Sequence, residues 1–193
     1  MTTYILHGGR YKVESPDNEY FFKQFTEHVP KDNVKILMCY WARPKENWAL
    51  LFERDKARVA KQTSKTVDVQ KVDTVEALRI GLPDADVLFV SGGEEELLRP
   101  YMSQLGFLQE MIRGKVFIGS SMGTFLASKN YALSLSTQNE NTVYEGLGLI
   151  PYNTLCHWDI EINKEKKIAL LKDKDPHTPI LCIDEGKFER LVA

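Results

Sequence analysis

Short runs of apolar and β-branched residues recur along the chain at similar intervals. Each run has the length of a strand and little alternation with polar residues, so we expect both of its faces to be buried. Between the first five runs, apolar residues repeat every three or four positions, as they do on one face of a helix. The expected strands are residues 4–6, 34–40, 66–69, 86–90, 116–119 and 180–183, and the expected helices are 18–29, 46–60, 74–80 and 94–113.

This alternation of strands and helices predicts an α/β fold. Repeated strand–helix units form a mostly parallel sheet through right-handed crossovers, so we expect a three-layer sandwich with helices on both faces of the sheet. Residues 130–158 interrupt the pattern with short strands and turns, which we interpret as a hairpin-like excursion before a helix at 164–171 and a closing strand. We expect residues 1–193 to form a single domain, with functional residues just beyond the carboxyl ends of the strands.

Composition and charge narrow the range of partners. The 193 residues are 43% hydrophobic and 27% charged, as in ordinary globular proteins, and the net charge is -2 with basic and acidic residues interspersed. Nothing in this balance favours nucleic acid or an anionic membrane surface. No basic N-terminal region precedes a long apolar run, and no run approaches the ~18 residues of a membrane helix. We therefore expect a cytoplasmic monomer or homodimer that acts on small molecules or short peptides.

The three cysteines do not suggest a cross-link or a metal site. Cys39, Cys156 and Cys182 are odd in number, far apart and surrounded by apolar residues. This arrangement resembles neither a disulfide framework nor the paired spacing of a zinc site. We expect buried free thiols, and neither a metal nor another cofactor.

The stretch VFIGSSMGTFLASK, residues 116–129, contains the strongest chemical signal. A predicted strand runs directly into a helix here, and a serine on such a tight turn projects its hydroxyl above the sheet. Of the two serines, only Ser121 has a glycine two residues away on each side, Gly119 and Gly123, matching G-x-S-x-G. Ser121 is therefore the candidate nucleophile. The alternative is a glycine-rich turn in which Ser120 or Ser121 caps the helix.

A serine nucleophile needs a base, and the chain has four histidines. His157 is the best candidate because it follows a short apolar run, next to an aromatic and an acidic residue. His28 lies in an amphipathic segment and His177 in a polar loop, so we expect both at the surface. His7 follows the first strand at the functional rim and remains open as a ligand or base.

An acid should orient the imidazole of His157. Glu185 follows the last buried run, and if that strand lies in the sheet that carries Ser121, this glutamate reaches the same rim. Glu140, in a turn between the serine and the histidine, is the rival, and Asp159 is a weaker one.

Backbone N–H groups should stabilise the oxyanion of a tetrahedral intermediate. The residue after the nucleophile, Met122, supplies one such group. Gly92 or Gly93 supplies another, because glycine lets the backbone approach a substrate closely after the fourth strand. The alternative interpretation of these two glycines is a tight turn that leads into the next helix.

Together these segments resemble the peptidase E (aspartyl dipeptidase) family, peptidase family S51, whose members include cyanophycinases. The likeness extends through most of the chain and is carried by ILMCYWARPKENW, LPDADVLFVSGGEEELL, VFIGSSMGTFLAS and EGLGLIPYNTLCHWD. It implies a flavodoxin-like fold similar to class I glutamine amidotransferases, with serine in place of their cysteine. It also implies a triad of Ser121, His157 and Glu185, the last in a DEG that matches the family's PEG. An aspartate between serine and histidine has a role in the family, and Glu140 falls near its position.

The sequence also departs from the family pattern. Glu94 and Glu95 stand where the family has Asn and Thr after Gly-Gly, and Ser120 and Met122 flank the nucleophile where the family favours Trp and Ala. The segment INKEKKIAL has only lysines where an arginine-rich stretch is expected to bind the substrate carboxylate.

The resemblance implies a metal-independent serine peptidase that cleaves dipeptides or short peptides, with N-terminal aspartate as the family's preferred residue. Arg10 and Arg43, which follow the first two strands, are candidates for binding a substrate carboxylate. Two alternatives remain open. One is an esterase or amidase with the same centre, and the other is a non-catalytic relative that keeps the pocket for ligand binding.

Overall fold

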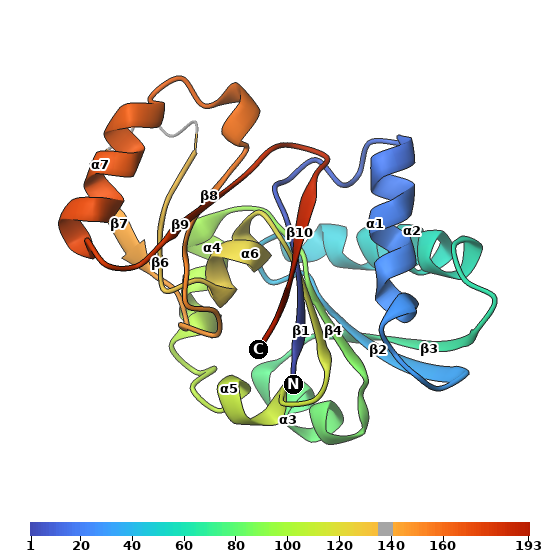
Figure 1. The fold of residues 1–193 in the computed structure, drawn as a ribbon. Coiled ribbons are helices and arrows are strands. Elements are labelled where there is room, and N and C mark those ends of the chain that lie inside the picture. The colour runs from blue at the N-terminus through green and yellow to red at the C-terminus, as the bar shows by residue number, and fades with distance from the viewer. Residues whose placement is uncertain (135–140) are drawn as a thin grey trace.

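The computed structural model describes residues 1–134 and 141–193 (Figure 1). These residues form two sheets flanked by helices. The strands are β1 Thr3–His7, β2 Asn33–Cys39, β3 Thr66–Val72, β4 Val87–Val90, β5 Val116–Ser120, β6 Asn130–Ala132, β7 Val143–Glu145, β8 Asn153–Cys156, β9 Ile180–Ile183 and β10 Phe188–Val192. The α-helices are α1 Pro16–Glu27, α2 Trp48–Lys61, α3 Val75–Gly81, α4 Glu95–Met102, α5 Leu108–Met111, α6 Met122–Ala127 and α7 Lys164–Lys174.

The larger sheet has the strand order β10-β1-β5-β4-β2-β3. Five of its strands are parallel, and only β10 runs antiparallel, against β1. Helices cover both faces: α1 and α2 lie on one side of this sheet, and α3, α5 and α6 lie on the other (Figure 1). The predicted α/β fold with a mostly parallel sheet is confirmed.

Local sequence accounts for several of the helix boundaries. Ser15 caps α1 by accepting a hydrogen bond from the Asn18 N–H, and Thr74 caps α3 in the same way. The segment expected as one helix at 94–113 is two helices, α4 and α5, separated by turns at residues 103–107. Pro100 lies in the last turns of α4 and cannot donate a backbone hydrogen bond, which favours an early end to the helix.

Strands β4 and β5 are buried along their whole length, as the sequence predicted. Strand β3 is different, because four of its seven residues are partly buried or buried and the other three are exposed. It lies at the edge of the larger sheet, where it has one neighbouring strand instead of two. The expectation that both of its faces are buried is therefore wrong.

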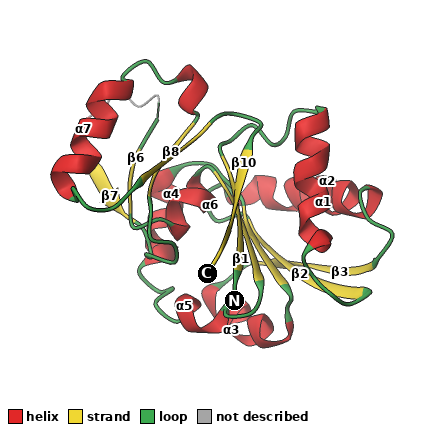
Figure 2. Ribbon diagram, viewed as in Figure 1, coloured by secondary structure: helices red, strands yellow, loops and turns green. Residues whose placement is uncertain are grey.

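The smaller sheet has the order β7-β6-β8-β9. Strands β6 and β7 pair antiparallel, and β6, β8 and β9 pair in parallel. Its core is a small cluster of Ala132, Leu155 and Leu171, the last from α7. Strand β9 was expected in the sheet that carries Ser121, and this expectation is wrong. The closing strand of the larger sheet is instead β10, which lies at the edge of that sheet (Figure 2), and its five residues are all exposed or partly buried.

The main core lies between the larger sheet and its helices. On the α1 side it is aromatic, with Phe21, Phe22 and Phe25 of α1 packed near Phe89 of β4. All three cysteines are free thiols; Cys39 and Cys156 are buried and Cys182 is half-buried. Within residues 1–134 and 141–193, no helix is long and apolar enough to cross a membrane, and no group of three or more His, Cys, Asp or Glu side chains is arranged to hold a metal ion.

Candidate active site

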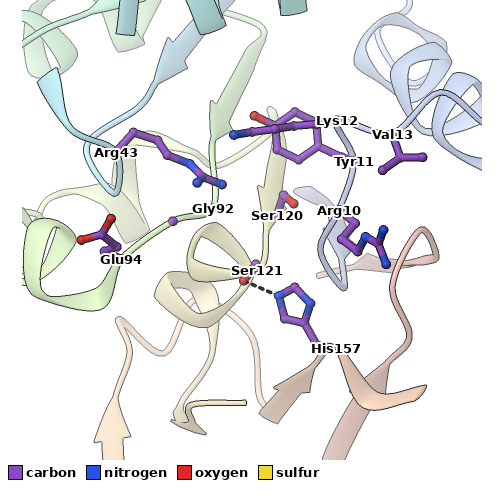
Figure 3. Close-up of a pocket in the computed structure, with 11 residues that line it drawn as sticks. Arg10, Tyr11, Lys12, Val13, Arg43, Gly92, Glu94, Ser120, Ser121 and His157 are labelled. Carbon is purple, nitrogen blue, oxygen red and sulfur yellow. Dashed lines mark hydrogen bonds between the residues drawn. The ribbon is translucent and has the colours of Figure 1, made fainter. Parts of the chain in front are cut away.

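Ser121 occupies the sharp turn between β5 and α6. Its φ of 48° and ψ of −106° lie outside the regions that L-residues normally adopt, at a cost of about 1–3 kcal/mol. The surrounding structure maintains this conformation. The Ser121 N–H donates to the His7 carbonyl at 2.9 Å, and the Ser121 carbonyl accepts from the Phe125 N–H at 2.9 Å. The turn presents the Ser121 hydroxyl to a pocket (Figure 3).

The two glycines of the G-x-S-x-G motif have a steric role. A Cβ atom on Gly119 would lie 2.5 Å from the backbone of Gly123, and a Cβ on Gly123 would lie 2.0 Å from the Val90 carbonyl oxygen. Strand β5, helix α6 and strand β4 therefore approach so closely that neither position accepts a side chain. This close approach is what holds the turn at Ser121 tight.

His157 follows β8 and faces Ser121. The His157 Nε2 lies 3.0 Å from the Ser121 Oγ, as the dashed line in Figure 3 shows. The residue adopts a left-handed conformation with φ 53° and ψ 36°, and its N–H donates to the Gly8 carbonyl at 2.9 Å. Gly9 lies against the imidazole, because a Cβ on Gly9 would meet the His157 Cε1 at 2.1 Å. The loop after β1 therefore supports the ring of His157.

Glu185 lies in the turn between β9 and β10, on the far side of the imidazole from Ser121. Its Oε1 is 2.6 Å from His157 Nδ1, and its Oε2 accepts a hydrogen bond from Arg10 Nη1 at 3.0 Å. The Glu185 side chain is 10% exposed, so this carboxylate is largely shielded from water. Asp159, considered as a weaker rival acid, instead accepts the backbone N–H of Glu185 at 2.9 Å and fixes that turn.

The structure thus brings Ser121, His157 and Glu185 into one hydrogen-bonded row. Ser121 comes from the larger sheet and His157 from the end of the smaller sheet, while Glu185 lies on the connection between the two sheets. Glu140, the other candidate acid, lies outside the described residues.

His7 is not a candidate base in this structure. Its side chain is completely buried, with Nε2 2.9 Å from Asn18 Oδ1 and Nδ1 accepting the Gly9 N–H at 3.0 Å. Burial lowers the pKa of His7 to about 4, which keeps the ring neutral at pH 7. Both ring nitrogens already take part in hydrogen bonds within the protein. The possibility, left open by the sequence, that His7 acts as a ligand or base is therefore wrong. Of the two histidines expected at the surface, His28 is half-buried at the end of α1 and His177 is exposed.

A pocket of about 410 Å³ opens beside Ser121 and His157 (Figure 3). Three basic residues contribute to its wall, and they differ in their partners. Arg10 binds Glu185, whereas Arg43 and Lys12 extend over the pocket near Gly92 with no ion-pair partner among the described residues. The buried Nε of Arg43 has no acceptor there either. The remaining lining residues are Tyr11, Val13, Gly92, Gly93, Glu94, Ser120, Ser121 and His157.

The two glycines after β4 have different neighbours. A Cβ on Gly92 would lie 2.5 Å from the Ser120 carbonyl oxygen and 2.9 Å from Ser121 Cβ, so Gly92 lies directly against the turn of Ser121. A Cβ on Gly93 would instead lie 1.9 Å from the Ala42 carbonyl oxygen, in the loop after β2. The alternative interpretation, a turn that leads into a helix, also fits because α4 begins two residues after Gly93.

The glutamates that depart from the family pattern contribute unequally to the pocket. Glu94 is exposed and lines the pocket, whereas Glu95 is buried and forms an ion pair with Arg99 one helical turn later. Of these two glutamates, only Glu94 gives the pocket a carboxylate that has no ion-pair partner among the described residues.

That Tyr11, Lys12 and Ser120 line the pocket was not predicted from the sequence. Tyr11 and Lys12 directly follow HGGR after β1, so their position at the carboxyl end of a parallel strand was an available signal. The Ser120 Oγ is buried and without a hydrogen-bond partner among the described residues.

Partial burial, together with the nearby Arg43 and Arg54 guanidinium groups, lowers the pKa of Lys12.

The sequence model of peptidase family S51 matches residues 5–190. The chain belongs to peptidase family S51. Membership of this family supports a peptidase, and therefore a hydrolase. No protein with a curated description matches the sequence significantly.

Two solved structures share the fold. One is a Listeria monocytogenes EGD-e protein assigned as peptidase E, with a TM-score of 0.63 and 18% identity over 100% of this chain and 99% of that one. The other is a peptidase from an acI-B1 actinobacterium, with a TM-score of 0.65 and 20% identity over 96% of this chain and 81% of that one. At these identities the likeness establishes the α/β fold that the sequence predicted.

Proposed function

We propose that this protein is a serine peptidase that hydrolyses dipeptides or other short peptides through an acyl-enzyme. The supporting observation is the row of Ser121, His157 and Glu185, with distances of 3.0 Å and 2.6 Å between their polar atoms. A serine hydroxyl is a weak nucleophile alone, and an imidazole within hydrogen-bonding distance makes it effective. Glu185 then holds the imidazole in the required tautomer and stabilises its protonated form.

The reaction would begin when His157 takes the Ser121 proton while Oγ attacks the peptide carbonyl carbon. The carbonyl oxygen gains negative charge, and the N–H groups of Met122 and Gly92 are the proposed donors to it. Gly92 is preferred to Gly93 because it lies against Ser121. His157 next gives its proton to the departing amine, so the C–N bond breaks and the acyl-enzyme remains. Water, deprotonated by His157, then hydrolyses the ester.

The pocket supports a short, acidic substrate. Its volume of about 410 Å³ accommodates a few residues rather than a folded chain. Arg43 is the proposed carboxylate-binding residue, since its guanidinium has no acidic partner in the described chain, whereas Arg10 is already bound to Glu185. The exposed carboxylate of Glu94 is suited to the substrate's free α-amino group. An N-terminal aspartate would meet both requirements.

A panel of substrates tests this proposal. We expect the parent protein to hydrolyse aspartyl p-nitroanilide and aspartyl dipeptides, and Ser121→Ala to lower turnover by at least about 10³-fold with unchanged thermal unfolding. A fluorophosphonate probe should label Ser121 in the parent and leave Ser121→Ala unlabelled. Hydrolysis of simple esters alone would favour an esterase or amidase instead. Absence of both labelling and turnover, with unimpaired ligand binding by Ser121→Ala, would favour the non-catalytic alternative.

A further inference from the structure

A buried polar network links helix α2 to the loop beside the candidate nucleophile. Its centre is Asp55 in α2, whose side chain is fully buried. The Asp55 carboxylate accepts hydrogen bonds from Arg54 Nε at 2.8 Å, from the Tyr40 hydroxyl at 3.0 Å and from the Tyr11 hydroxyl at 3.1 Å. A buried charge with this many donors is satisfied and geometrically fixed. The proposed mechanism makes no use of this carboxylate.

The network continues from Tyr11 to Ser91, and its direction follows from the chemistry of the groups. Asp55 forms an ion pair with Arg54, and an ionised carboxylate only accepts hydrogen bonds, so the Tyr11 hydroxyl donates its single proton to Asp55. The Tyr11 oxygen can then accept the proton of Ser91 Oγ, which lies 2.9 Å away. The other acceptor near Ser91 Oγ is the Gly92 carbonyl, at the longer distance of 3.2 Å.

Ser91 adjoins the loop that would donate to the oxyanion. It is completely buried just after β4, and the next residue, Gly92, lies against the Ser121 turn. Because one peptide unit joins Ser91 to Gly92, a displacement of Ser91 would also move the Gly92 N–H. An oxyanion donor is effective only when it is held at hydrogen-bonding distance before the reaction, so small displacements are costly.

We propose that Tyr11 is a positioning residue for this loop. The Tyr11 hydroxyl, oriented by Asp55, holds Ser91 by a hydrogen bond and so keeps the Gly92 N–H in position against the Ser121 turn. Tyr40 makes the equivalent hydrogen bond to Asp55, but among the described residues its hydroxyl makes no hydrogen bond to Ser91. The kinetic consequence rests on the proposed serine peptidase function, whereas the holding of the loop can be measured without it.

Tyr11→Phe and Tyr40→Phe form a matched pair, because each keeps its ring and removes one hydroxyl donor from Asp55. The first readout is amide hydrogen exchange by NMR at Ser91 and Glu94, whose N–H groups donate to the Cys39 and Ala42 carbonyls at 2.9 Å and 2.7 Å. We expect Tyr11→Phe to accelerate exchange at both amides by about tenfold, and Tyr40→Phe to change it by less than about twofold.

The second readout is steady-state hydrolysis of a peptide that the parent cleaves. We expect Tyr11→Phe to lower kcat by about tenfold with little change in KM, because the missing contact acts on the transition state. Tyr40→Phe should lower thermal stability about as much as Tyr11→Phe while kcat stays within about twofold of the parent. Adding Ser91→Ala to Tyr11→Phe should cause little further loss of kcat, since both changes break the same link.

Equal exchange rates in the two variants, or equal losses of kcat, would overturn the inference. Faster exchange in Tyr11→Phe with an unchanged kcat would overturn its catalytic part. If the parent neither hydrolyses peptides nor reacts with the fluorophosphonate probe, the proposed function has failed, and the exchange comparison alone decides whether Tyr11 holds the loop.

Discussion

The close approach at Gly123 leads to a quantitative prediction for Gly123→Ala. The new Cβ would lie 2.0 Å from the Val90 carbonyl oxygen, whereas Cβ atoms in proteins essentially never come within 3.0 Å of a heavy atom outside their own residue and its chain neighbours. Strand β4 or helix α6 must therefore shift by about 1 Å, the difference between these distances. Val90 contributes backbone of a central strand, so relief by side-chain rotation is not available.

The expected loss of stability follows from two opposing contributions. Overpacking a well-packed interior costs about 1–3 kcal/mol, and a clash with backbone belongs at the upper end. Alanine in place of glycine within a helix gains about 1 kcal/mol. The net destabilisation is about 2 kcal/mol. In a chain of this size each kcal/mol lowers the melting temperature by about 2–4 °C, so Gly123→Ala should melt about 4–8 °C below the parent.

Thermal unfolding followed by circular dichroism measures this difference, and Gly106→Ala is the matched control. A Cβ on Gly106 meets no heavy atom within 4 Å. Its replacement by alanine should leave the free energy of unfolding unchanged or raise it by up to about 1 kcal/mol, because alanine lowers the conformational entropy of the unfolded chain. If Gly123→Ala melts within about 2 °C of Gly106→Ala, the steric explanation of the serine turn is wrong.

Three further predictions concern individual ionisable groups. Glu185→Gln should lower kcat on the order of 10³-fold while melting within about 3 °C of the parent; an unchanged kcat would remove Glu185 from the mechanism. Because the pKa of His7 is about 4 in the folded protein and about 6.5 in the unfolded chain, the unfolded chain binds the proton first as pH falls. Stability should therefore decrease by about 3 kcal/mol from pH 7 to pH 4, and His7→Gln should flatten this slope in urea titrations. Burial raises the pKa of the Cys39 and Cys156 thiols, so iodoacetamide should reach them only on unfolding; rapid labelling of either in the native protein would contradict their burial.

Much of the fold could be predicted from the sequence because parallel strands buried on both faces have a strong apolar signature. Runs such as those in β4 and β5 cannot be stable unless they are covered by helices, and the intervening periodic segments provide that cover. The position of β9 could not be predicted in this way. Its apolar run indicates a strand but contains no information about which neighbour completes it, and long-range pairing with β8 decided the outcome.

The candidate site shows the same limit. The motif around Ser121 is local, so its position and steric requirements could be predicted from spacing. His157 and Glu185 were selected by residue type and by their position after strands, and their 2.6 Å contact depends on how the two sheets dock. The burial of His7 could not be anticipated, since it depends on Asn18, a partner from α1 that carries no sequence signal of its own.

Because of the arrangement of the candidate triad, catalytic activity should depend sensitively on the relative position of the two sheets. The hydroxyl belongs to one sheet, the imidazole to the other, and the carboxylate to the segment that joins them. A slight hinge opening at this seam would separate the three groups while leaving nearly all helices and strands intact. Such a molecule would retain its far-ultraviolet spectrum and lose its turnover, so inactivation by mild denaturant is expected to precede the spectroscopic transition.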